Sequence, residues 1–147
     1  MRLVSDIFKE FNIEFLKNSN LKELKELYLN NNNISDIKVF EKVNFEKLEI
    51  LNLRQNFISN FDILKNVNFK ELKYLNLSWC DFVNGNVLGK ENFKKLEKLD
   101  LERNEIANIE FLKNSNFKEL KELYLNDNKI SNISVLENVN FEELKYI

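Results

Sequence analysis

The sequence predicts a single-domain repeat protein of the α/β class, in which each repeat supplies a strand, a turn and a short helix. Three observations lead to this prediction: a 24-residue period, an L-x-L alternation in each full copy, and apolar residues at helical spacing behind a capping side chain. The chain has 147 residues. That length suits one domain, which should bury roughly two-thirds of the surface that its unfolded chain exposes.

The period runs through nearly the whole chain. Residues 117–140 read FKELKELYLNDNKISNISVLENVN, and residues 45–68 read FEKLEILNLRQNFISNFDILKNVN. The same unit spans 21–44, 69–92 and 93–116, a sixth copy occupies 141–147, and residues 13–20 match the tail of a further unit. We therefore expect one domain over 1–147, with repeats over 13–147 and the last repeat incomplete.

The N-terminal segment precedes the repeats. Leu3, Ile7 and Phe11 follow one another at four-residue steps, which predicts an amphipathic capping helix over 1–12 that covers the first strand. The alternative is a helix that lies on a membrane surface, but its polar face lacks the Lys/Arg cluster that such helices carry.

The first half of each unit predicts a short strand. Its seventh and ninth positions are leucine, as in Leu75 and Leu77, so both side chains point to one side of the strand. The first position is aromatic in five of the six copies, and the fourth position is leucine in all of them. These columns are the predicted core.

The second half of each unit predicts a short helix or 3₁₀ turn. The sixteenth position holds a good N-cap residue in the five full copies: Asp36, Asn60, Asn84, Asn108 and Asn132. Apolar residues then recur at three-residue steps, for example Ile133, Leu136 and Val139. Each unit closes with an asparagine, which we expect to adopt the left-handed conformation that ends a helix.

The pattern L-x-x-L-x-L-x-x-N-x-I resembles the leucine-rich repeat (LRR) family. The added I-x-x-I step, as in Ile106 and Ile109, is most similar to the subclass of bacterial internalins and the phosphatase regulatory subunit, here with 24-residue units. The resemblance implies a right-handed solenoid with a concave parallel β-sheet and short convex helices or 3₁₀ turns. Asparagines at the twelfth position are then expected to bond backbone groups of the adjacent turn. Cys80 takes this place in the third unit, where we expect a small buried side chain rather than a nucleophile.

The composition narrows the possible functions. The chain has no His, one Cys and a net charge of -2, which argues against metal sites, cofactors and nucleic-acid binding. No stretch approaches the ~18 apolar residues that a membrane span needs. A carboxylate enzyme built on Asp100 and Glu102 is the alternative, but those two acids lack an accompanying constellation. We expect a non-enzymatic protein in the cytoplasm.

The candidate binding residues vary between copies while the core columns stay constant. They occupy the positions that flank the L-x-L leucines, which point out of the predicted sheet, and the residues just beyond the strand. An aromatic and apolar zone and a charged zone lie in neighbouring units, and exposed aromatics ringed by polar groups are typical of protein interfaces. The candidates on this concave face are Tyr28, Ile50, Arg54, Phe57, Tyr74, Trp79, Lys98, Asp100, Glu102, Arg103 and Tyr124. The alternative for the aromatic residues is that they only stabilise neighbouring strands.

The resemblance implies a protein-binding module whose partner is a protein held on the concave face. The alternative is a structural segment of a longer array that self-associates through its C-terminal strand edge, near Leu144 and Ile147. In the third unit, Gly85 replaces the Ile or Phe of other copies, and with Gly89 it predicts a looser convex turn.

Overall fold

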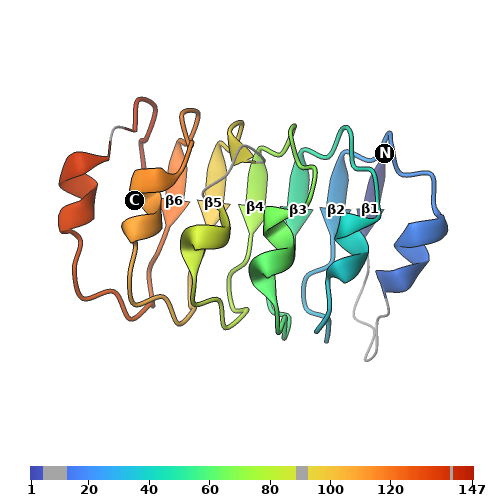
Figure 1. Cartoon of the computed structure of the whole chain (residues 1–147), viewed down its shortest axis with the longest axis horizontal. Helices are drawn as coiled ribbons and strands as arrows, with labels where there is room; N and C mark the ends of the chain where they lie inside the picture. Colours follow the sequence, from blue (N-terminus) through green and yellow to red (C-terminus); the bar gives the residue numbers. More distant parts are fainter. Residues whose placement is uncertain (5–12, 89–92, 140) are drawn as a thin grey trace.

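The chain folds into a solenoid of stacked units around one six-stranded parallel sheet (Figure 1). The computed structural model describes residues 1–4, 13–88, 93–139 and 141–147. The strands are β1 (Arg2–Val4), β2 (Glu26–Tyr28), β3 (Ile50–Asn52), β4 (Tyr74–Asn76), β5 (Lys98–Asp100) and β6 (Glu122–Tyr124), and they lie in sequence order. The fold class predicted from the repeat is confirmed.

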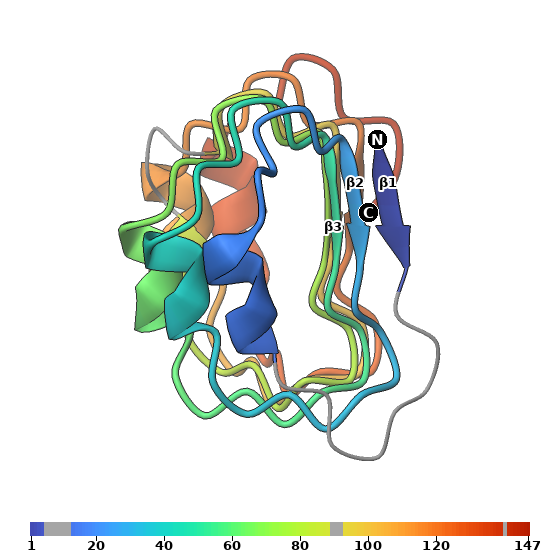
Figure 2. The ribbon, with the colours of Figure 1, turned by 90° about the vertical axis from the view of Figure 1, so that its right-hand side faces the viewer.

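The other side of the molecule carries short 3₁₀ helices, one for each unit (Figure 2). They are η1 (Ile13–Asn18), η2 (Lys38–Glu41), η3 (Phe61–Lys65), η4 (Gly85–Leu88), η6 (Glu110–Asn114) and η7 (Ser134–Asn138). No helix in the described ranges has the length and apolar character needed to cross a membrane.

Strand register follows the repeat. Leu27, Leu51, Leu75, Leu99 and Leu123 stand side by side along the sheet and are fully buried. Behind the leucines, the phenylalanines at the first position form a column, with ring centroids of Phe45 and Phe69 5.8 Å apart and those of Phe69 and Phe93 6.4 Å apart. One continuous core therefore runs the length of the solenoid, because no unit can bury its apolar face alone.

The twelfth-position asparagines form the expected ladder between units. Asn104 Nδ2 donates to the carbonyl oxygens of Leu77 and Leu101 at 2.9 and 3.0 Å, and its Oδ1 accepts from the N–H of Cys80 and of Phe82. Asn56 makes the corresponding bonds to Leu29 and Leu53. The buried amide thus pairs backbone groups that neither the sheet nor a helix reaches.

The predicted N-cap is confirmed at Asn60, which caps η3, whereas the N-cap residues of η2, η6 and η7 are Ile37, Ile109 and Ile133, which make no capping hydrogen bond through a side chain. The side chains of Asp36, Asn60, Asn84, Asn108 and Asn132 each accept a hydrogen bond from the N–H two residues on. The expected left-handed conformation at the closing asparagines is wrong for Asn44, Asn68 and Asn116, while Asn92 and Asn140 lie outside the described residues. The left-handed residues stand instead at the eleventh position of each full unit, with φ between 52° and 58°: Asn31, Gln55, Trp79, Arg103 and Asp127. Asp81, at the thirteenth position of its unit, is also left-handed, with a φ of 55°.

The N-terminal helix expected over 1–12 is wrong for its first residues. Arg2–Val4 form strand β1, Leu3 is in register with Leu27, and the N–H of Lys25 donates to the carbonyl oxygen of Met1 at 2.9 Å. A strand forms here because it pairs with the backbone groups along the edge of β2. A helix would leave those groups without sheet partners. Leu3 precedes Leu27 by one period, so it stands at the seventh position of a preceding unit, which the sequence reasoning missed. Residues 5–12 lie outside the described residues.

The Gly85 turn is not loose. Gly85 begins η4 and is buried, and a Cβ built on it would lie 2.1 Å from Cδ1 of Phe111. Glycine is required because the Phe111 ring of the next unit occupies the space of its side chain. Gly89 lies outside the described residues.

Candidate protein-binding face

The concave face is the outer surface of the sheet together with the tenth, eleventh and thirteenth positions that follow each strand. In-register pairing puts equivalent residues of successive units next to one another: Ile50 pairs with Tyr74, which pairs with Lys98, which pairs with Glu122. The face is therefore a set of columns whose chemistry is set by the variable positions.

Lys98 joins two aromatic side chains on this face. Its Nζ lies 5.5 Å from the ring centroid of Tyr74 and 4.7 Å from that of Tyr124, and it contacts Glu122 Oε2 at 2.7 Å. The hydrogen bond with Glu122 holds the pKa of Lys98 above its ordinary value, although burial opposes the shift. Tyr124 also stacks on Tyr146, with centroids 6.0 Å apart. The cation is thus committed to neighbours within the chain.

A buried polar cluster occupies the centre of the face. Asn76 Nδ2 donates to the hydroxyl of Tyr74 at 2.8 Å and to Asp100 Oδ2 at 3.0 Å, while Asn76 Oδ1 accepts from the hydroxyl of Ser78 at 2.7 Å. Asn76 is 4% exposed and Ser78 is fully buried. A fully paired network of this kind is rigid, because breaking one bond would leave a buried polar group unpaired.

Asp100 is the ionisable member of this cluster. Burial raises the pKa of its carboxyl above the ordinary value, and the charge of Glu102 adds to the effect. The N–H of Glu102, donated to Asp100 Oδ1 at 3.1 Å, and the cations Arg54 and Lys98 oppose it. Of the two acids considered for an enzyme, Asp100 is held by Asn76 and by the Glu102 backbone, and the carboxylate of Glu102 lies 3.4 Å from Arg103.

Trp79 stands where β4 leaves the sheet, between two guanidinium groups. The Cζ of Arg103 lies 4.5 Å from its ring centroid and that of Arg54 lies 5.9 Å away, and the side chain stays exposed by 42%. Its φ of 57° is left-handed, a conformation that is strained for a bulky residue. Arg103 is paired with Asp127 at 2.8 Å and with Glu102 at 3.4 Å.

The aromatic zone expected from the sequence is not one stacked cluster. Among the described residues, no ring pair joins Tyr74, Trp79 and Phe57, and the rings of Tyr74 and Trp79 contact cations instead. Phe57 is 64% exposed. Ile50 and Tyr28 are half-buried within the strands, and Arg2 covers the Tyr28 ring at 4.6 Å. The structure thus brings the charged and aromatic zones together through cation–π contacts.

Two of these features escaped the sequence reasoning. The left-handed eleventh position gives Trp79 and Arg103 their direction, and the absence of glycine there concealed it. The pairing of Asn76 with Asp100 was also missed, although both occupy the eighth position of adjacent units and this spacing could have revealed it.

Cys80 is buried and offers no chemistry on this face. Burial raises the pKa of its thiol to about 11, and its Sγ contacts the carbonyl oxygen of Leu53 at 3.1 Å. A thiol with so high a pKa is almost wholly protonated at neutral pH and is a poor nucleophile.

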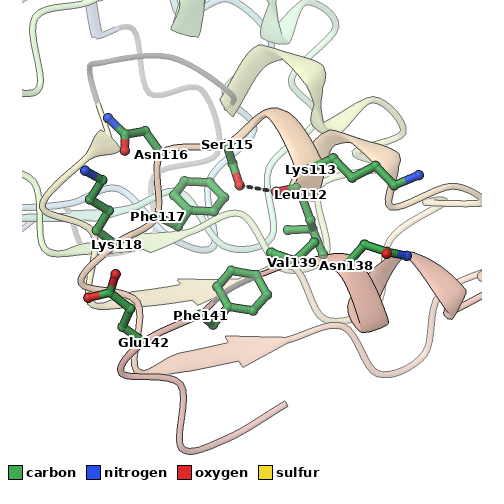
Figure 3. A pocket seen from close by; sticks show the side chains of 10 residues that line it. All are labelled: Leu112, Lys113, Ser115, Asn116, Phe117, Lys118, Asn138, Val139, Phe141 and Glu142. Carbon is green, nitrogen blue, oxygen red and sulfur yellow. Dashed lines mark hydrogen bonds between the residues drawn. The ribbon is translucent and has the colours of Figure 1, made fainter.

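Two pockets near the C-terminal end of the described residues are lined by residues other than Trp79. One of ≈ 290 Å³ lies between the last two units, where the rings of Phe117 and Phe141 face it and Ser115 Oγ donates to the Leu112 carbonyl oxygen at 2.8 Å (Figure 3). Another, of ≈ 420 Å³ and largely apolar, adjoins β6 and is lined by Ile109, Tyr124, Leu125, Asn126, Ile130, Ile133, Leu136, Tyr146 and Ile147. Over the described parts of the chain, no three metal-ligating side chains are grouped to hold an ion.

Comparisons with known proteins agree with this architecture. Three solved structures are similar: an internalin (inlF) of Listeria monocytogenes (22% identity, TM-score 0.77, 99% of this chain and 39% of that one), an internalin C2 of the same species (23%, 0.65, 95% and 67%) and an LRR protein of Leptospira interrogans (25%, 0.70, 86% and 31%). The chain thus spans about two-fifths of the first and under one-third of the third. Curated proteins include no significant sequence match.

The family comparison rests on the repeats themselves. The model described as "Leucine Rich repeats (2 copies)" matches residues 22–66 and 94–138, which together make up more than half of the chain. Each match covers nearly two of the units described above. The chain belongs to the leucine-rich repeat family.

Proposed function

We propose that this chain is a non-catalytic protein-binding module that holds a partner protein on its concave face. LRR proteins commonly mediate protein–protein interactions and are typically not enzymes. The proposal depends on Trp79, a large aromatic side chain that keeps 42% of its surface exposed on the face that also carries the hydrogen-bonded cluster around Asn76. Tryptophan and arginine are the residues that most often dominate binding energy at protein interfaces.

The rigid surroundings favour binding. The strand ladder continues past β4, because the N–H of Trp79 donates to the carbonyl oxygen of Glu102 at 3.1 Å and that of Gln55 donates to Ser78 at 2.9 Å. A partner would therefore meet side chains whose backbone is already ordered, which reduces the entropy lost on binding.

The test compares two double variants in a pull-down from lysate. Phe57→Ala/Trp79→Ala removes two exposed aromatics of the concave face, and Phe15→Ala/Val83→Ala removes two exposed apolar side chains elsewhere. We expect the first double variant to lose a partner that wild type and the second variant retain, since a hot-spot tryptophan contributes roughly 2–4 kcal/mol. Equal capture by all three proteins would contradict binding at this face.

A second candidate function is self-association beside β6. The ≈ 420 Å³ pocket there is apolar, and Ile133, Tyr146 and Ile147 around it are each at least 60% exposed. Such a patch favours contact with a second apolar surface. Sedimentation velocity of wild type and Ile133→Glu over a range of concentrations tests it: association lost in the variant supports this candidate, and a wild-type monomer at every concentration contradicts it.

A further inference from the structure

Arg54 differs from the other cations on the concave face in lacking an acidic partner. Arg2 pairs with Glu26 at 3.5 Å, Lys98 with Glu122 at 2.7 Å, and Arg103 with Asp127 at 2.8 Å. For Arg54, no carboxylate of the described residues lies within 4.0 Å of the guanidinium, and the contact it makes there is with the Trp79 ring. An unpaired guanidinium is therefore offered to solvent beside the exposed tryptophan.

The backbone of Arg54 is firmly held. Its N–H donates to Asn52 Oδ1 at 3.0 Å, and its carbonyl oxygen accepts from the N–H of Asn31 at 2.8 Å. The residue is half-buried, and its guanidinium carbon lies 5.9 Å from the centroid of the Trp79 ring. Holding the backbone in this way reduces the ordering cost of using the guanidinium in binding.

The charge around Arg54 selects the kind of anion. The charge of Arg54 opposes the rise in the pKa of Asp100 that burial causes, so the two charges interact although they do not form a close pair. Glu102 occupies the same tenth position two units further on, beyond Ser78, and Asp81 follows Trp79 by two residues. These acids repel a doubly charged phosphate more strongly than a singly charged carboxylate, because repulsion scales with the charge of the ligand.

We propose that Arg54 binds one carboxylate of a partner protein, from an Asp or Glu side chain whose neighbouring apolar residue packs on Trp79. The inference rests on the proposed function, since it names the partner chemistry of the same face. Arginine suits this role because its planar fork matches both oxygens of a carboxylate. A bound carboxylate would give Arg54 an acidic partner, as Asp127 does for Arg103 within the chain.

The test is a random peptide library displayed on phage, selected on the full chain and depleted on Phe57→Ala/Trp79→Ala. The chain has one Trp, so its fluorescence reports binding of each synthetic peptide at Trp79 itself. We expect the enriched peptides to share one acidic residue beside an apolar one. Replacing that acid by its amide should weaken binding about tenfold to wild type and much less to Arg54→Gln.

Three comparisons decide the outcome. Lys38→Gln, which removes one positive charge from η2 on the opposite side, should bind as wild type does. Peptides that need Trp79 but whose acid contributes equally in wild type and Arg54→Gln would overturn the role of Arg54 and leave the proposed function standing. A phosphoserine peptide that binds more tightly than the acidic one would overturn the assignment to carboxylate. A library without Trp79-dependent binders would contradict both proposals.

Discussion

At the scale of single residues, a side chain that differs from the repeat pattern must find its contacts among neighbouring groups. Cys80 replaces one asparagine of the ladder, and its thiol keeps a weak contact with the Leu53 carbonyl oxygen at 3.1 Å. The thiol cannot replace the accepting oxygen, however. In other units the Oδ1 of the ladder asparagine accepts a hydrogen bond from the N–H at the fourteenth position of the preceding unit. Asn56 Oδ1, for example, accepts from the N–H of Ile34 at 3.0 Å. The N–H of buried Ile58 has no such partner among the described residues.

Restoring the ladder should therefore stabilise the protein. We expect Cys80→Asn to raise the free energy of unfolding by about 1 kcal/mol, because its amide can donate to Leu53 and accept from Ile58. Denaturant melts of wild type, Cys80→Asn and Cys80→Ala measure this. If the asparagine variant proves no more stable than the alanine variant, the missing oxygen is not the cause.

The left-handed eleventh position leads to a second prediction. Gln55 has a φ of 56°, which a side chain disfavours and glycine does not. We expect Gln55→Gly to raise the free energy of unfolding by about 0.5–1 kcal/mol after the greater flexibility of glycine in the unfolded chain is allowed for. Asn31→Gly is the matched control and should gain less, since asparagine tolerates this conformation. Chemical denaturation of both variants tests the difference, and a larger gain at Asn31 would contradict the explanation.

At the scale of elements, a small side chain on one 3₁₀ helix is matched by a larger one on the next helix. Gly85 of η4 faces Phe111 of η6, whereas other units carry a large residue at the position of Gly85 and Val or Ile at that of Phe111. The total volume between neighbouring helices is thus roughly preserved, as close packing requires.

This matching of side-chain sizes predicts that a second substitution can restore stability lost through the first. Gly85→Ala should lower the free energy of unfolding by about 1–3 kcal/mol, because its Cβ would lie 2.1 Å from Phe111 Cδ1. Gly85→Ile should be worse alone but should recover much of the loss when combined with Phe111→Val. A double-mutant cycle of melting curves measures the coupling, and strictly additive effects would show that the two residues do not share the space.

At the scale of the whole molecule, two rows of alternating charge run along the solenoid. At the fifth position the order is Lys25, Glu49, Lys73, Glu97 and Lys121, and at the third position the signs are opposite: Glu23, Lys47, Glu71, Lys95 and Glu119. Acids in these rows can therefore pair with lysines of neighbouring units, as Glu49 does with Lys25 at 3.0 Å and with Lys73 at 3.1 Å. The rows favour one stacking order of units, since a shift by one unit would place like charges together.

The rows also predict a dependence of stability on pH. Hydrogen bonds from Lys25 and Lys73 hold the pKa of Glu49 below its ordinary value, so the charged carboxylate stabilises the folded state. That contribution is complete above the unfolded pKa of about 4.3 and is lost as the pH falls through the lower folded value.

We expect Glu49→Gln to cost up to about 1 kcal/mol at pH 7 and nothing near pH 2, because exposed pairs are weak individually. Urea melts across this range measure the difference. Glu119→Gln is the matched control, since no ion pair of Glu119 occurs within the described residues, and it should change little at any pH. A loss at Glu49 that does not depend on pH would exclude the charge as its cause.

The sequence alone determined the repeat, the strand register and the buried columns, because each unit can bury its leucines only against an identical neighbour. The same logic identified the asparagine ladder and the N-cap at Asn60, and it placed the candidate residues on one face. Only the tertiary structure decided which candidates interact there. Trp79 and Arg103 take their direction from a left-handed backbone that any of five residue types adopts. Asp100 bonds to Asn76, and Arg54 has no carboxylate within 4.0 Å among the described residues. These choices depend on distances between units, which a period along the chain does not contain.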